Sequence, residues 1–182
     1  RNYLDRMINK KVKCMRIAKK YSKDYWDGKR DYGYGGYKYI EDYWTPVARS
    51  LIKKYKLSNK SKILDVGCGK GFLLYEIKKI LPKISVVGID ISRYGLINSK
   101  KEIKKYLKFF DIRGNLPYKK KYFDLAFSIN TLHNLEINHL TNAIKQIKKV
   151  SKNSYICVES YKNEDELFNL QCWTLTCETF FS

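Results

Sequence analysis

The sequence predicts an α/β fold built on a doubly wound, mostly parallel sheet. Short apolar runs alternate with helical segments from residue 62 onward, and this alternation is typical of βαβ units. A glycine-rich turn, GCGKG at 67–71, follows the first apolar run and opens the first helix. In doubly wound sheets that turn binds a nucleotide-like ligand. The length of 182 residues fits one such core with a modest extension.

Residues 62–160 are expected to form this core. The apolar runs that we interpret as buried strands are residues 63–66, 86–89, 107–112, 123–129 and 155–158. The segments with helical periodicity between them are residues 72–80, 92–106 and 137–150. In the last of these, apolar residues at 140, 143, 144 and 147 form one stripe, and lysines occupy the opposite face.

Residues 1–61 are predicted to form a helical and aromatic lid segment. In residues 1–22, apolar residues at 4, 8, 12 and 15 recur among basic ones, which predicts an amphipathic helix. We expect this stripe to pack on the protein's own core, with RNA or membrane contact as the alternative. Residues 25–44 are rich in Tyr, Trp and Gly, so their rings either line a ligand site or cover the core. Thr45 and Pro46 suit the N-cap and first position of a helix that runs towards residue 57.

Residues 161–182 are predicted to be a C-terminal segment that belongs to a longer native chain. The acidic start of this segment, NEDE at 163–166, suits a helix N-terminus. The later residues, which include Phe180 and Phe181, are too apolar for a free tail. We therefore expect either that the protein continues past Ser182 or that this segment packs on a partner chain, as in a homo-oligomer.

The chain is strongly basic, with 37 Lys and Arg against 18 Asp and Glu and a formal net charge of +19. Such a charge favours a polyanionic partner, for example a nucleic acid. However, the charge is spread along the chain, and 30 of the basic residues are Lys, whereas direct base reading favours Arg. Abundant Lys, Ile, Asn and Tyr also indicate a compositional bias of the genome, so nucleic acid is a possible but not a favoured partner.

The composition indicates a cytoplasmic protein without a membrane partner. No uncharged apolar stretch reaches the roughly 18 residues of a membrane-spanning helix, and the first residues lack the apolar centre of a signal peptide. The five cysteines form no CxxC pair and no set with zinc-ligand spacing, so we expect reduced thiols and no metal site.

Two spaced motifs carry the chemistry. The first is LDVGCGKG at 64–71, and the second is Gly88-Ile89-Asp90, which places a carboxylate 19 residues after Gly71. A carboxylate at that point can accept hydrogen bonds from both ribose hydroxyls. Dinucleotide sites use GxGxxG, but here Phe72 stands at the third glycine position. A phosphate-binding P-loop is also excluded, because no Gly-Lys-Ser or Gly-Lys-Thr follows.

With these motifs, the chain resembles the class I S-adenosylmethionine (SAM) dependent methyltransferases over about residues 60–160. Residues 64–71, 87–92, 111–112 and 123–130 are similar to that family's first four motifs, in the family's order. The resemblance implies a Rossmann-like methyltransferase fold and SAM as the cofactor. It also implies that this chain lacks the two antiparallel strands with which family members usually finish.

The resemblance also implies roles for individual residues. Asp65 would hold the amino group of SAM, although a turn-stabilising carboxylate is the alternative. The positions expected to bind the other parts of the cofactor are Gly67, Cys68, Gly69 and Gly71 at the methionine part, Asp90 and Ile91 at the ribose and adenine, Asp111 and Ile112 at the adenine edge, and Asn130 and Thr131 near the sulfonium.

Four further residues are candidates for the acceptor side. His133 follows the fourth strand and could remove a proton from the acceptor, because its unperturbed pKa of about 6.5 suits neutral conditions. The alternative, a loop histidine that orders the pocket, is the favoured interpretation. Tyr34, Tyr37 and Tyr39 are weaker candidates for a lid over the cofactor.

We expect a methyltransferase that acts on an oxygen or nitrogen of a small-molecule metabolite. The run LHNL at 132–135 is similar to the runs of small-molecule methyltransferases, and it departs from the Pro-Pro pattern of DNA amino-methyltransferases. An RNA methyltransferase is the second hypothesis, and a non-catalytic SAM-binding module is the third.

Overall fold

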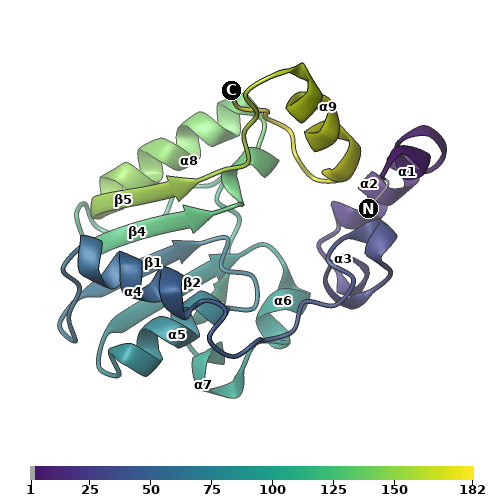
Figure 1. Ribbon diagram of the computed structural model, residues 1–182. Coiled ribbons are helices and arrows are strands. Elements are labelled where there is room, and N and C mark those ends of the chain that lie inside the picture. Colours follow the sequence, from purple (N-terminus) through teal and green to yellow (C-terminus); the bar gives the residue numbers. More distant parts are fainter. Residues whose placement is uncertain (1–2) are drawn as a thin grey trace.

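The computed structural model describes residues 3–182 and contains one five-stranded sheet (Figure 1). The strands lie in the order β3-β2-β1-β4-β5, and all four neighbouring pairs are parallel. Their bounds are β1 Lys62–Val66, β2 Ser85–Asp90, β3 Leu107–Phe109, β4 Phe123–Ile129 and β5 Ser151–Cys157. The predicted doubly wound α/β fold is therefore confirmed, and the sheet described here contains no antiparallel strand.

Two predicted strand boundaries are wrong. The strand expected over 107–112 ends at Phe109, because its neighbour β2 ends at Asp90 and the carboxylate of Asp111 accepts the Arg113 N–H in a turn. The strand expected over 155–158 begins earlier, at Ser151. Its first residues are polar, and the three that follow the buried Ser151 are exposed on this edge strand, so hydropathy does not indicate them.

Helices cover both faces of the sheet (Figure 1). On one face, α4 (Thr45–Lys54) and α5 (Phe72–Ile80) pack with Ile63, Leu125 and Phe127 of the strands. On the other face, α8 (Ile137–Val150) packs with alternate strand residues such as Leu64 and Ala126. The helices expected over 72–80 and 137–150 are confirmed at both ends, since a regular apolar stripe marks them.

Two helix predictions need correction. The helix expected over 92–106 is two short helices, α6 (Arg93–Ile97) and α7 (Lys101–Lys104), with a break at 98–100. In α4, Trp44 and not Thr45 occupies the N-cap position, and Pro46 lies in the first turn. The Thr45 hydroxyl donates instead to the buried carboxylate of Glu76, 2.8 Å away.

The N-terminal helices lie beside α9, at a distance from most of the sheet (Figure 1). They are α1 (Leu4–Asn9), α2 (Lys11–Ala18), α3 (Lys23–Asp27) and the 3-10 turn η1 (Arg30–Tyr32). The prediction that their apolar stripe packs on the core is wrong, because Leu4, Ile8 and Val12 are 44%, 70% and 61% exposed. The helix is interrupted at Lys10, so those residues do not share one continuous face.

The C-terminal segment packs on the chain itself. Helix α9 (Glu164–Trp173) begins where the Asn163 side chain accepts the Glu166 N–H, as the acidic start of the segment predicts. Leu175 then packs with Cys14 and Ala18 of α2. Arg6 and Lys11 donate to the last carbonyls of α9, so the two ends of the chain are joined directly.

Two further findings concern the cysteines and the question of a membrane-spanning helix. All five cysteines are free thiols. Among residues 3–182, no helix has both the length and the apolar character needed to cross a membrane.

Candidate active site

The glycine-rich turn after β1 is fixed against the end of β2. The N–H groups of Gly67 and Cys68 both donate to the Ile89 carbonyl, at 2.8 and 3.0 Å. Gly67 has a φ of +81°, and a Cβ built there would lie 2.1 Å from the Thr131 hydroxyl. Glycine is therefore required at this position, and the turn after β1 meets the loop after β4.

Asp90 closes the turn from the next strand. Its two carboxylate oxygens accept the N–H groups of Gly69 and Ser92, at 2.8 and 2.7 Å. Burial raises the pKa of Asp90, and these backbone hydrogen bonds oppose that shift. The parallel register, which pairs Val66 with Ile89, explains why this carboxylate lies beside the glycine turn.

Asp65 is a buried acid without a protein partner. Its side chain belongs to a residue that is 5% exposed, and it has no hydrogen bond or salt bridge within residues 3–182. Burial, and then the nearby charge of Asp90, raise the pKa of Asp65 well above its usual range. Buried carboxylates are normally paired, so this one indicates a place for a positively charged ligand group.

Both acids face one cavity of about 490 Å³. Its lining combines the carboxyl ends of the strands with aromatic residues from 21–44 and with Thr176 and Glu178 near the C-terminus. The predicted site residues that line it are Tyr34, Tyr37, Asp65, Gly67, Cys68, Gly69, Asp90, Ile91, Asp111, Ile112, Asn130 and Thr131. The structure thus brings together twelve of the predicted positions.

Three predicted positions lie outside this lining. Gly71 is a packing glycine with a φ of +69°, and a Cβ there would lie 2.9 Å from the Leu107 side chain. The Tyr39 hydroxyl donates to Glu76 of α5. His133 is buried in the turn η2 (Leu132–Asn134), where its carbonyl accepts the N–H groups of residues 178 and 179. Burial lowers the pKa of His133 to about 4.

Trp26 is a cavity residue that the sequence reasoning did not single out. Its indole is stacked on Tyr34, with ring centroids 5.3 Å apart and planes 9° apart. The indole N–H donates to the Ser92 hydroxyl at 2.7 Å, and the ring lies 2.8 Å from the Cβ position of Gly69. The aromatic composition of 25–44 indicated a ligand site or a core cover, but no local pattern distinguished Trp26 from the neighbouring rings.

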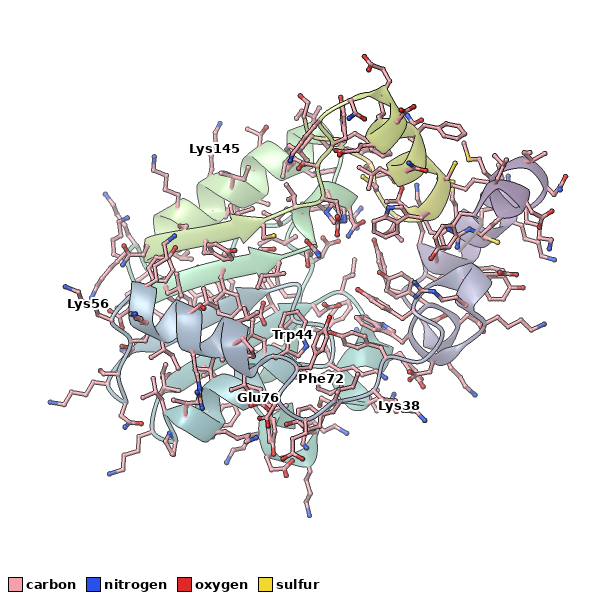
Figure 2. The ribbon with its side chains drawn as sticks, viewed as in Figure 1. Lys38, Trp44, Lys56, Phe72, Glu76 and Lys145 are labelled. Carbon is pink, nitrogen blue, oxygen red and sulfur yellow. The ribbon has the colours of Figure 1, made fainter. Side chains whose placement is uncertain are left out.

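A buried ion pair joins residues 19–44, which we call the lid from here on, to the glycine turn. Lys70 is 4% exposed, and its Nζ lies 2.9 and 2.7 Å from the two oxygens of Asp27 and 2.7 Å from the Tyr37 carbonyl. The Tyr94 hydroxyl also donates to Asp27, at 2.9 Å. Trp44, at the N-cap of α4, and Phe72, the first residue of α5, both line the cavity, while Lys56 and Lys145 point away into solvent (Figure 2).

Comparisons with known proteins bear on the family of this chain. A family model described as "Methyltransferase domain" matches residues 57–181. An uncharacterized protein from Methanocaldococcus jannaschii is 32% identical over 120 residues, which are 64% of this chain and 48% of that protein. A tRNA (carboxymethyluridine(34)-5-O)-methyltransferase from Arabidopsis thaliana is 32% identical over 125 residues, which are 68% of this chain and 29% of that protein.

A solved structure gives the same result for the fold. A SAM-dependent methyltransferase from Aquifex aeolicus is 18% identical, with a TM-score of 0.51 over 70% of this chain and 77% of that one. The chain spans less than half the length of the two curated relatives named above. Since the family model covers most of the chain, the protein belongs to the class I SAM-dependent methyltransferase family, whose methyl donor is S-adenosylmethionine.

Proposed function

We propose that this protein transfers a methyl group from SAM to an oxygen or nitrogen of a small-molecule metabolite. The observation that carries the proposal is the unpartnered, buried carboxylate of Asp65 beside the glycine turn. The ammonium group of SAM is the complement that this carboxylate lacks. The cavity of about 490 Å³ also lies within the roughly 300–1,000 Å³ range of small-ligand pockets.

The remaining cofactor residues fit the same ligand. Each Asp90 oxygen accepts one backbone N–H and keeps a further lone pair, so the carboxylate can also accept ribose hydroxyls. Ile91 is 39% exposed within the cavity lining and offers an apolar surface to the adenine. SAM, when bound, supplies an electrophilic methyl group on a positively charged sulfur.

In this proposal, the cavity residues around the methyl acceptor position it and exclude water. The acceptor would receive that methyl group on a lone pair and would release its proton to solvent, while the cofactor would keep the electron pair of the broken carbon–sulfur bond. Asn130 and Thr131 follow β4 directly and line the same cavity as Tyr34 and Tyr37. His133 lies outside the cavity lining, and burial makes it a poor proton acceptor near neutral pH. In this proposal the rate therefore comes from alignment of the acceptor with the methyl group and not from His133.

Replacement of Asp65 tests the cofactor site. Asp65→Asn should weaken SAM binding about hundredfold, because removing one partner of a buried charge pair costs roughly 3 kcal/mol. The same variant should melt at a higher temperature at pH 7, since the free enzyme no longer buries an unpaired acid. Calorimetry and thermal unfolding measure the two effects. The matched control is Glu102→Gln, an exposed acid on α7. Unchanged affinity would show that Asp65 does not hold the ammonium group.

An RNA substrate is the second candidate, because the chain carries +19 and one relative is named as a tRNA methyltransferase. Methyl transfer from labelled SAM into a metabolite extract and into an RNA pool separates the two candidates. Label in the RNA alone, together with salt-sensitive RNA binding, would replace the metabolite proposal. SAM binding without any transfer would leave a non-catalytic SAM-binding module.

A further inference from the structure

The cavity is acidic although the chain is basic. Five carboxylates line it, together with the basic side chains of Lys19, Arg113 and His139. Lys19 and Arg113 are already paired with carboxylates of the lining. Arg113 Nε lies 2.8 and 3.0 Å from the two oxygens of Asp111, and Lys19 forms an ion pair with Glu178. Within residues 3–182, His139 is therefore the one basic side chain of the lining without a salt bridge.

The other three carboxylates have no salt bridge among the described residues. They belong to Asp65, Asp90 and Glu136. In the proposed function the first two hold the cofactor, which leaves Glu136 at the acceptor side. An anionic group that entered this space would find Lys19 and Arg113 already paired, and His139 would be the one basic side chain without a salt bridge within residues 3–182. The carboxylates of the lining would repel such a group.

Several aromatic rings also line the cavity. Tyr25 contacts Tyr34 edge to face, with centroids 5.3 Å apart, and Tyr34 stacks on Trp26. Burial raises the pKa of Tyr21 to about 12 and that of Tyr25 well above its usual range, so both phenols are neutral. Ring faces of this kind favour a flat ring or a cation.

We propose that the methyl acceptor is a neutral or cationic molecule with a flat ring, and that the site discriminates against carboxylate- or phosphate-bearing acceptors. This inference rests on the proposed function and specifies its substrate class. The overall charge of +19 does not contradict it, because most of the lysines are exposed and few charged groups reach the cavity.

Three matched probes test this inference by binding. Tyramine, 4-hydroxyphenylacetamide and 4-hydroxyphenylacetate share one ring and one hydroxyl and differ in a cationic, neutral or anionic end group. Calorimetry on the SAM-saturated protein should show at least about tenfold tighter binding of the amine and the amide than of the carboxylate. Equal or tighter binding of the carboxylate would overturn the inference, and so would the absence of binding by all three.

A charge variant sharpens the test. Glu178→Gln leaves Lys19 without its acidic partner, so binding of 4-hydroxyphenylacetate should strengthen at least about threefold relative to the amide. Asp165→Asn, an exposed acid of α9, should leave the ratio unchanged and serves as the control. An unchanged ratio in Glu178→Gln would show that the paired charges do not set the selectivity. Binding in the expected order without methyl transfer would contradict the proposed function and keep this inference.

Discussion

The two sides of the cavity are held in place by different kinds of interaction. On the sheet side, backbone ladders between β1, β2 and β4 position Asp65, Gly67 and Asp90. On the lid side, residues 19–44 are attached to the site by a few side-chain contacts, chiefly those of Asp27 and Trp26. Single substitutions should therefore detach the lid while the sheet side keeps its geometry.

The largest expected effect comes from the ion pair between the two sides. Asp27→Asn leaves the buried Lys70 ammonium without its carboxylate, which should lower the free energy of unfolding by about 3 to 4 kcal/mol. Burial alone would raise the pKa of Asp27, but hydrogen bonds from Lys70, the Tyr37 N–H and Tyr94 outweigh it and lower that pKa.

Urea denaturation measures this loss. The double variant Asp27→Asn with Lys70→Met is the control, because it removes both charges and should lose less stability than Asp27→Asn alone. If the single and double variants lose the same stability, the pair does not join the lid to the glycine turn.

His133 gives the next largest effect, through pH. Its pKa falls from 6.5 to about 4 on burial, so the unfolded chain binds a proton between those pH values and the folded chain does not. Stability should therefore be complete above pH 6.5 and fall by about 3 kcal/mol as the pH drops to 4.

Unfolding curves at several pH values check this. In His133→Gln, the free energy of unfolding should differ less between pH 6.5 and pH 4 than in the unchanged protein. Subtracting the pH profile of the variant from that of the unchanged protein removes the contribution of the buried acids, which both proteins share. A His133→Gln profile parallel to that of the unchanged protein would mean that His133 is accessible to protons, as a catalytic base would be.

The contrast between the two sides also explains which features the sequence could predict. The sheet side follows from local patterns, since the turn, the acid of β2 and the regular stripes of α5 and α8 each lie within a short segment. The lid does not, because Asp27 and Lys70 are 43 residues apart and neither side chain indicates the other. The N-terminal stripe was mispredicted for a related reason. The interruption at Lys10, together with packing of Cys14 against Leu175, decides which residues are buried.

The smallest expected change in stability concerns a tyrosine of the lid that does not line the cavity. Tyr39 lies outside the lining, and its hydroxyl donates to Glu76, which also accepts from Thr45. Tyr39→Phe should therefore lower the free energy of unfolding by about 1 kcal/mol, the typical contribution of one hydrogen bond. SAM affinity should stay within about twofold, because the ring and its packing on Phe72 are kept.

Tyr37 is the matched comparison, since it lines the cavity and lies 5.3 Å from Phe72 between ring centroids. Tyr37→Leu should reduce SAM affinity at similar or smaller cost in stability, because it removes a ring from the cavity wall itself. Calorimetry with SAM on both variants makes the comparison. A larger loss of SAM affinity in Tyr39→Phe than in Tyr37→Leu would contradict this expectation. It would mean that the hydrogen bonds of Glu76 in α5 determine the geometry of the cofactor site.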